Sequence, residues 1–254
     1  MNHFFRFCVL VALAAVGASR ASADLVLSTP SGLNTGDHFR FIFVTGSTTA
    51  ATSSDITTYD TFVRNSVSSL YGNVTYGGSA ITNWLAVGST PTVNAKAHLG
   101  GYSPSVSVWL PDGTQVASSL DAETGGLWSG TLAHKIDQYL NGSTLGSSSS
   151  TWTGSDDAGL AYADYELGAS GSFVARGSTD DSSGGGWITF GKMDKAVSFA
   201  MYAVSPELIV QAAPTSVPEI DPASFGSVAA LLTGAFGLIE QRRRRRGTAI
   251  AATA

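Results

Sequence analysis

The amino-acid sequence predicts an α+β protein: a single β-rich domain with one main helix and long loops, between a signal peptide and a C-terminal transmembrane helix. Three observations predict this class. Several short segments have the alternating or aromatic composition of strands, one longer segment has a helical apolar stripe, and an apolar run lies near each end of the 254 residues. Charged residues make up only 13%, which excludes a charge-rich disordered chain, and the lack of long apolar runs elsewhere excludes a multi-span membrane protein.

Residues 1–23 are typical of a secretory signal peptide. A positively charged start is followed by an apolar stretch to about Ala18, and the small residues Ala21 and Ala23 fit the pattern that precedes a cleavage site. Asp24 is then the expected first residue of the mature chain. An uncleaved anchor helix is the alternative, which the shortness of the apolar stretch disfavours.

Cysteine usage and charge exclude several kinds of site in the mature chain. Cys8 is the only cysteine and lies inside the signal peptide, so no disulfide, thiolate metal site or cysteine nucleophile is expected. Residues 24–216 carry seven Lys and Arg against sixteen Asp and Glu. Because phosphate contacts need a basic surface, we expect no nucleic-acid partner.

Strand signals dominate the expected extracytoplasmic domain over 24–210. Residues 38–45 are aromatic and β-branched, as buried strands are, and 105–110 alternate with period two before the hairpin signal Asp112-Gly113. The other expected strands are 24–28, 115–116, 186–190 and 198–204, with 207–210 continuing the last of them.

One long helix is expected over 55–71, where apolar residues recur on a single helical face. The preceding residues, 52–55, provide capping side chains for its first turn. A second, shorter helix is expected over 93–99. The sequence therefore predicts a domain in which helices are few and strands carry the core.

The segment 120–184 is rich in Gly, Ser and Asp and is typical of long loops. Trp128 and Trp152 are expected to anchor these loops to the core. Loop tyrosines could stack on sugar rings or belong to the core, and sequence alone does not separate the two. The tyrosines concerned are Tyr102, Tyr162 and Tyr165.

The last part of the chain combines a proline motif, an apolar run and an arginine cluster. After a linker over 211–216, two prolines hold the motif 217–222 extended. The apolar run over about 223–240 is long enough to cross a bilayer as a helix. Five arginines at 242–246 cannot cross it cheaply, so they should stay cytoplasmic and leave the body of the protein outside. A short uncharged tail, 247–254, follows.

This arrangement resembles the bacterial PEP-CTERM sorting signal, in which a Pro-Glu-Pro-like motif, a short transmembrane helix and an arginine cluster close the chain. The residues that carry the resemblance, within 217–246, are Val217, Pro218, Glu219, Ile220, Asp221 and Pro222, followed by Arg242, Arg243, Arg244, Arg245 and Arg246. The resemblance implies recognition and cleavage by an exosortase, a membrane protease-transpeptidase, and export alongside exopolysaccharide or to the cell envelope. The extra tail departs from the family pattern. A plain C-terminal membrane anchor is the alternative.

The order of the expected elements resembles C-type-lectin-like and endostatin-like domains, and bacterial lectin-like domains of unknown function in particular. The resemblance covers roughly 36–210 and rests on Phe43-Val44-Thr45, on 127–130 and on 152–154. It implies a C-type-lectin-like fold that binds glycan or protein through its long loops. The Glu-Pro-Asn and Trp-Asn-Asp motifs of the calcium-dependent sugar site do not occur in this sequence, and neither do the family's disulfides.

Acidic residues cluster late in the domain. The candidates for calcium ligands are Asp156, Asp157, Asp180 and Asp181. Calcium takes about six to eight oxygen ligands, but this spacing matches no calcium loop, so solvated loops are the plainer interpretation and no cofactor is assigned. A glycosidase pair of Asp164 and Glu166 is a further alternative, which the requirement for opposed carboxyls disfavours.

Histidines and glycines add no catalytic motif. His38, His98 and His134 are widely spaced and match no zinc pattern, so we expect surface or strand-edge positions for them. The glycine run 184–186 lacks the lysine of a phosphate-binding loop and is expected to form a flexible turn before the strand at 186–190.

These observations predict an exported cell-surface or extracellular-matrix protein, sorted and cleaved by an exosortase, with a structural or adhesive role and no enzymatic activity. Anchoring in the cytoplasmic membrane would be transient. The expected partners are the exosortase, the membrane, and exopolysaccharide or matrix proteins. Two alternatives stay open: a secreted calcium- or polysaccharide-binding lectin-like module, and an envelope hydrolase.

Overall fold

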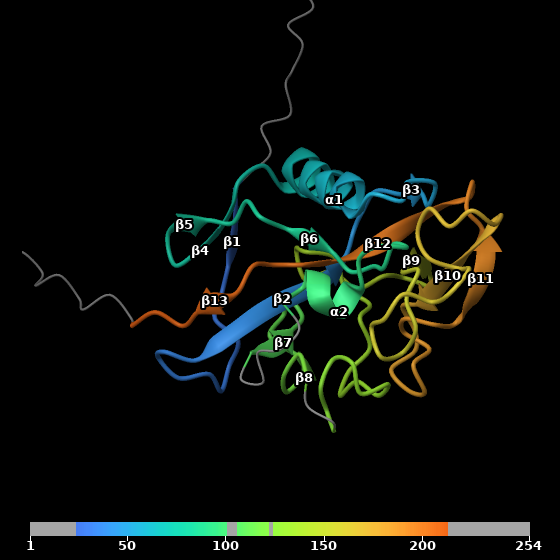
Figure 1. Cartoon of the computed structure of the whole chain (residues 1–254). Helices are drawn as coiled ribbons and strands as arrows, with labels where there is room; N and C mark the ends of the chain where they lie inside the picture. Colours follow the sequence, from blue (N-terminus) through green and yellow to red (C-terminus); the bar gives the residue numbers. More distant parts are fainter. Residues whose placement is uncertain (1–23, 101–105, 122–123, 213–254) are drawn as a thin grey trace, which may run out of the picture. The chain divides into compact units, whose positions relative to one another are not determined.

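Strand β2 (His38–Val44) is the central strand of a ten-stranded mixed sheet in the computed structural model (Figure 1). Its side chains alternate between two buried faces. The phenylalanines at 39, 41 and 43 belong to one hydrophobic cluster, while Ile42 and Val44 belong to another. All five side chains are at most 1% exposed. An aromatic and β-branched segment suits this position because both faces of the strand are covered.

The large sheet combines parallel and antiparallel neighbours. In spatial order its strands are β11 (Gly191–Asp194), β10 (Phe173–Ser178), β9 (Ser150–Trp152), β12 (Ser198–Val204), β2, β7 (Ser107–Trp109) and β8 (Gln115–Ala117). Three short strands pair beside this path: β13 (Leu208–Ile209) with β2, and both β3 (Thr49–Ala50) and β6 (Leu85–Ala86) with β12. The pairs β9–β12 and β2–β7 are parallel. A separate sheet has the order β1 (Leu25–Leu27), β4 (Val74–Tyr76) and β5 (Ser79–Ala80).

Helix α1 (Ile56–Tyr71) confirms the long helix expected from the apolar stripe. The Asp55 carboxylate caps its start by accepting from the Thr57 amide at 2.9 Å. The helix ends at Gly72, whose positive φ of 63° allows the chain to turn away. The apolar side of α1 packs over the sheet near β6 (Figure 1). The second helix, α2 (Ala95–His98), lies within the predicted segment but is only four residues long.

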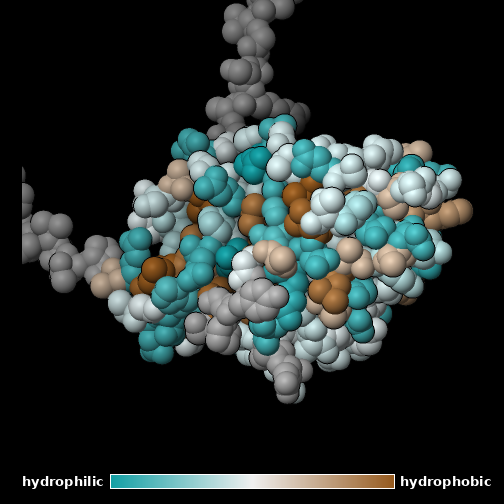
Figure 2. Space-filling view, viewed as in Figure 1, coloured by the Kyte–Doolittle hydropathy of each residue, from teal (hydrophilic) through white to brown (hydrophobic). Residues whose placement is uncertain are grey.

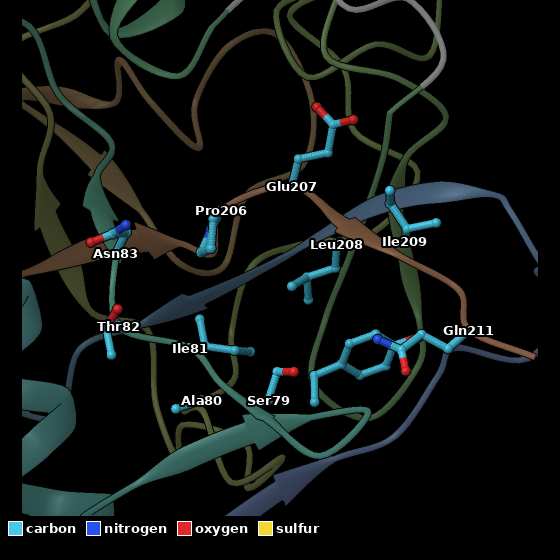
Figure 3. Close-up of a pocket in the computed structure, with 11 residues that line it drawn as sticks. Ser79, Ala80, Ile81, Thr82, Asn83, Pro206, Glu207, Leu208, Ile209 and Gln211 are labelled. Carbon is cyan, nitrogen blue, oxygen red and sulfur yellow. The ribbon is translucent and has the colours of Figure 1, made fainter. Parts of the chain in front are cut away.

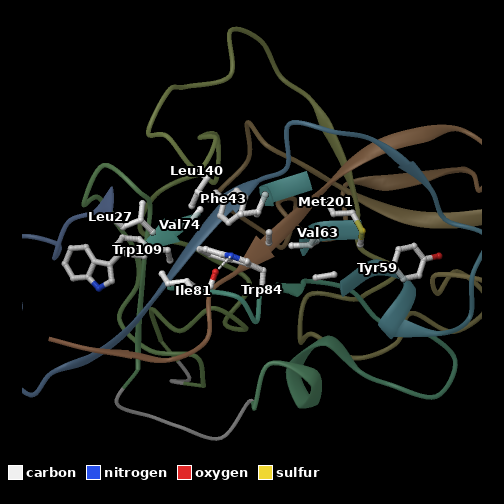
Figure 4. Close-up of a cluster of buried hydrophobic side chains, with 14 of the residues drawn as sticks. Leu27, Phe43, Tyr59, Val63, Val74, Ile81, Trp84, Trp109, Leu140 and Met201 are labelled. Carbon is white, nitrogen blue, oxygen red and sulfur yellow. Dashed lines mark hydrogen bonds between the residues drawn. The ribbon is translucent and has the colours of Figure 1, made fainter. Parts of the chain in front are cut away.

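Two hydrophobic clusters cover the opposite faces of the sheet. On the side of α1, the indole of Trp84 lies at the centre of the cluster and its Nε1 donates to the Ile81 carbonyl at 3.1 Å (Figure 4). The Phe43 ring meets Trp84 edge-on, with 5.3 Å between centroids. In the other cluster the Trp128 and Trp187 ring centroids are 5.9 Å apart. Trp128 therefore does anchor its loop to the core, as predicted.

Residues 184–188 form a turn and no strand is present over 186–190, so the strand predicted there is wrong. Trp187 and Ile188 are consecutive and pack into the same hydrophobic cluster, whereas a strand would send them to opposite faces. The turn backbone crosses directly over β10: a Cβ on Gly177 would lie 1.8 Å from the Trp187 carbonyl oxygen. The glycine run thus starts a turn that presses its backbone onto a neighbouring strand, and pairing resumes only in β11.

The predicted loop segment 120–184 contains two strands, β9 and β10. Trp152 is fully buried within β9, so it is part of the sheet and not a loop anchor. The many Ser and Gly residues of this segment hide the strands, because small polar residues have low strand propensity. The predicted continuation of the last strand over 207–210 is confirmed: β13 follows β12 along the same partner strand, β2, with the register shifted by one residue after Ser205-Pro206.

The structure describes residues 24–100, 106–121 and 124–212. The predicted signal peptide with Ala21 and Ala23, Tyr102, the sorting motif, the transmembrane helix, the arginine cluster and the tail lie outside these ranges. Within them, neither helix is long and apolar enough to cross a membrane.

The buried hydroxyl of Tyr59 on α1 should make stability depend on pH in alkaline solution. Burial raises the pKa of Tyr59 to about 12, although the Ser53 backbone bonded to its hydroxyl opposes the shift. The unfolded chain releases this proton near pH 10, so the contribution to stability is complete below about pH 10 and is lost as the pH rises toward 12.

Urea unfolding followed by Trp fluorescence across this pH window should show a smaller fall in unfolding free energy for Tyr59→Phe than for the wild type. Tyr139→Phe is the matched control, because it leaves the buried hydroxyl of Tyr59 in place. Equal alkaline slopes for wild type and Tyr59→Phe would contradict the assignment.

Candidate binding cleft beside the loop between β9 and β10

A cleft of about 600 Å³ lies between the loop that joins β9 to β10 and the segment before α1. Two backbone hydrogen bonds fix this loop. The Leu167 amide donates to the carbonyl of Ser89, which follows β6, and the Gly168 amide donates to the carbonyl of Ala51, which precedes α1, both at 2.9 Å. The residues that line the cleft are Ser54, Pro91, Thr92, Asp164, Glu166, Gly168, Ala169 and Ser170.

The close approach of the loop to the helix start depends on Gly168. This residue has a φ of +72°, and a Cβ built on it would lie 2.2 Å from the carbonyl carbon and oxygen of Ser53. Only glycine combines this left-handed conformation with such a short backbone contact. The wall of the cleft is therefore set by a backbone contact and not by a side chain.

Asp164 and Glu166, the acidic pair singled out in the sequence, both lie on the wall of this cleft. Asp164 is in a turn closed by the Tyr165 amide donating to the Tyr162 carbonyl at 2.8 Å, and not on a strand. Its φ of 69° is the one positive value outside glycine in the described part of the chain. Asp tolerates this conformation at the third position of a turn. Within the described ranges, neither carboxylate has a hydrogen-bond or ion-pair partner.

Two tyrosines adjoin the acidic pair in the sequence and share a lysine, although neither tyrosine lines the cleft. The rings of Tyr162 and Tyr165 meet edge-on at 5.3 Å between centroids. Lys192, on β11, places its Nζ 3.2 Å from the Tyr165 ring centroid and 4.8 Å from that of Tyr162. Partial desolvation would lower the pKa of Lys192, but the two tyrosine hydroxyls outweigh it and raise the pKa. The lysine is thus held as a cation against the aromatic pair.

Sugar recognition uses aromatic ring faces and carboxylate acceptors, and this group of residues offers both near an open concavity. Tyr162 and Tyr165 are half-buried, so their rings are fixed by packing yet reachable. Sequence reasoning found both tyrosines and both acids as separate candidates. It missed Lys192, since β11 lies far along the chain and carries no motif.

The side chains of the four calcium candidates make other contacts. Asp156 Oδ1 accepts from the Ala158 amide at 3.1 Å and from the Leu160 amide at 2.8 Å, and Asp181 Oδ1 accepts from the Ser183 amide at 2.9 Å. These bonds stabilise local turns. Asp180 pairs with Lys135 Nζ at 2.8 Å, which raises the pKa of that lysine. Asp157 packs against the Gly185 backbone. Across the described ranges, no group of three or more His, Cys, Asp or Glu side chains is placed to hold a metal ion.

The three histidines of the described ranges have different partners. His38, at the start of β2, pairs with Glu207, and His134 Nδ1 lies 2.9 Å from the Lys135 carbonyl. His98 is not a surface residue: its side chain is 14% exposed and its Nε2 lies 3.0 Å from Asp60 Oδ1. A helical projection of the sequence would have identified Asp60 as a buried charge, because it falls on the apolar face of α1.

A second concavity, of about 320 Å³, lies between β13 and the segment that joins β5 to β6 (Figure 3). Figure 3 shows Ile81 and Leu208 pointing toward one another across it, while the Glu207 carboxylate points away. Glu207 is its single charged lining residue and is already paired with His38. This groove therefore has no unpaired carboxylate on its wall, in contrast to the cleft beside Asp164.

The chain was compared with protein-family models and with curated proteins, and neither comparison found a match. The candidate site therefore rests on its own geometry.

Replacing Gly168 by Ala should destabilise the protein and distort the cleft. The added Cβ would collide with the Ser53 backbone, and the alanine backbone would have to keep the left-handed conformation of Gly168. We expect a loss of about 2–4 kcal/mol in the free energy of unfolding, measured by urea titration.

Gly146→Ala is the matched control, because no atom lies within 4 Å of the added Cβ and the residue has no positive φ. This variant should stay within about 1 kcal/mol of the wild type. Comparable stabilities for the two variants would show that the close contact at Gly168 is not required.

Proposed function

We propose that this chain is an exported cell-surface or matrix protein whose folded domain is a non-catalytic, adhesive module that binds polysaccharide. The observation that carries the proposal is the pair Tyr162–Tyr165, which adjoins in the sequence the two carboxylates that line the cleft, Asp164 and Glu166. Carbohydrates present flat C–H faces and rings of hydroxyl groups, so they suit adjoining aromatic faces and carboxylate acceptors.

The charge of the site favours a neutral polysaccharide. Two carboxylates lie on the cleft wall, and the acidic residues of 24–216 outnumber the basic ones by sixteen to seven. Anionic polymers would be repelled by this field, whereas hydroxyl groups donate to the carboxylates. Lys192, which lies against the Tyr165 ring, offsets part of this charge.

A C-type-lectin-like arrangement is part of the proposal. The order of strand, long helix, short strands and short helix, followed by Trp-containing loops and late strands, supports it. Such domains place their ligand sites on long loops, and the cleft proposed here is walled by the loop between β9 and β10. The absence of the Glu-Pro-Asn and Trp-Asn-Asp motifs from the sequence favours a sugar contact that does not use calcium.

Export and sorting are proposed from the two ends of the sequence. The signal-peptide pattern of 1–23 and the motif, apolar run and arginine cluster of 217–246 support a route through the cytoplasmic membrane, with an exosortase as the processing partner. Transient anchoring would place the domain on the outer side, where exopolysaccharide is present.

Processing can be checked by intact-mass measurement of the protein recovered from the cells that produce it. We expect a polypeptide that starts at about Asp24 and ends near Pro222. The double variant Pro218→Ala/Pro222→Ala should accumulate unprocessed in membranes. Recovery of the intact C-terminus from the wild type would leave only a plain membrane anchor.

Binding should depend on the ring of Tyr165. In calorimetric titrations with neutral exopolysaccharide, Tyr165→Ala should bind about tenfold more weakly, because a stacked ring is lost. Tyr165→Phe keeps the ring and is the matched control, so it should bind almost as well as the wild type.

Urea titrations of both variants separate a loss of binding from a loss of folding. Equal binding by Tyr165→Ala and the wild type would place the ligand elsewhere, and no binding by the wild type would reject the polysaccharide assignment.

A further inference from the structure

Strand β11 forms a free edge of the large sheet. It pairs with β10 on one side, in the register Met193 with Val174 and Lys192 with Ala175, and it is the last strand of the order (Figure 1). The Lys195 amide donates to the Ser172 carbonyl, so by alternation Met193 also directs its backbone groups toward β10. The backbone groups of Lys192 and Asp194 therefore face outward, away from the sheet.

We propose that a second copy of this chain pairs its β11 antiparallel with this edge, about a two-fold axis at Met193. In that register Lys192 lies opposite the partner's Asp194, and Asp194 lies opposite the partner's Lys192. Both are positions whose backbone groups face outward, so they form the hydrogen-bonded pairs, while the two copies of Met193 form the central non-hydrogen-bonded pair. This arrangement satisfies both the strand order and the hydrogen-bond alternation.

Charge complementarity singles out a second copy as the occupant. A lone lysine on an edge strand normally opposes pairing. Here Lys192 and Asp194 are two residues apart on β11, share one face and are both exposed; Lys192 Nζ also contacts the Tyr165 ring, and Asp194 Oδ1 also accepts from the Ala196 amide at 2.9 Å. Two-fold pairing sets each charge against its opposite, and opposite charges directly across a strand pair are favourable. The Asp194 carbonyl also accepts from the Val197 amide, at 3.0 Å, and its second lone pair is available to the partner.

Apolar side chains at both ends of the edge support the same contact. Phe190 precedes β11 and is 56% exposed, Phe173 lies opposite Asp194 at the start of β10 and is 53% exposed, and Val197 follows β11 and is 38% exposed. Figure 2 shows tan and brown surface at the right-hand rim, where Figure 1 places β11. A paired copy would shield part of this surface. Residues directly opposite share a face, so both Tyr162–Tyr165 pairs would lie on one side of the joined sheet.

The pairing can be tested by a charge exchange in the full chain, solubilised in mild detergent and carrying Cys8→Ser and Met193→Cys. The two copies of residue 193 would have Cα atoms about 4.5 Å apart, within the range for a disulfide. We expect a disulfide-linked dimer on mild oxidation. Lys192→Glu or Asp194→Lys alone should lower its yield about tenfold, because both charge pairs become repulsive.

Mixing the Lys192→Glu and Asp194→Lys chains should restore the yield as a heterodimer, since every pair is then opposite in charge. Val26→Cys, at a position that is 69% exposed on β1, reports random collision. Circular dichroism and sedimentation of the single charge variants without Met193→Cys check that folding is kept and that dimerisation weakens. Cross-linking at 193 no faster than at 26, or no recovery on mixing, would overturn the proposal.

Discussion

The antiparallel pairing of β12 with β2 is the constraint on which the rest of the structure depends. These two strands between them pair directly with β3, β6, β7, β9 and β13, and through these with the remaining strands of the large sheet. Two hydroxyl groups bind backbone amides across the pair: Thr45 Oγ1 accepts from the Met201 amide and Ser205 Oγ accepts from the Phe41 amide, both at 2.9 Å. Because no cysteine follows Cys8, burial on both faces holds this pairing without disulfides.

Buried polar contacts connect the helices and the cleft to that sheet. Asp60 Oδ1 accepts from the Ala86 amide at 2.8 Å and contacts His98, which joins α1 to β6 and α2. Ser89 Oγ accepts from the Ala95 amide at 2.8 Å and lies 2.7 Å from Ser155 Oγ, while its carbonyl holds Leu167. The loop that bears the acidic pair is thus fixed at several points to regular structure. Because folding already orders this loop, a ligand that binds there loses little further conformational entropy of the protein.

Local patterns predicted the elements whose stability is local or fully buried. The stripe between 56 and 71 gave α1 almost to the residue, and the composition of 38–45 identified β2. The signal failed where partners are distant. Trp187-Ile188 has strand composition, but the close contact at Gly177 makes it a turn, and the strand β9 is hidden in a Ser-rich segment. Of the candidate site, tyrosines and acids were visible in sequence, whereas their common cleft and Lys192 were not.

By itself, the sequence determined the β-rich class, the position of the long helix, the central strand and the export and sorting expectation, because each rests on composition or periodicity within one segment. The tertiary structure alone decided which loop meets the start of α1, which acids turn outward into a cleft and which cap their own turns, and which strand is left at the edge. Those outcomes depend on contacts such as that of Gly168 with Ser53, whose partners are more than one hundred residues apart, and no local pattern records them.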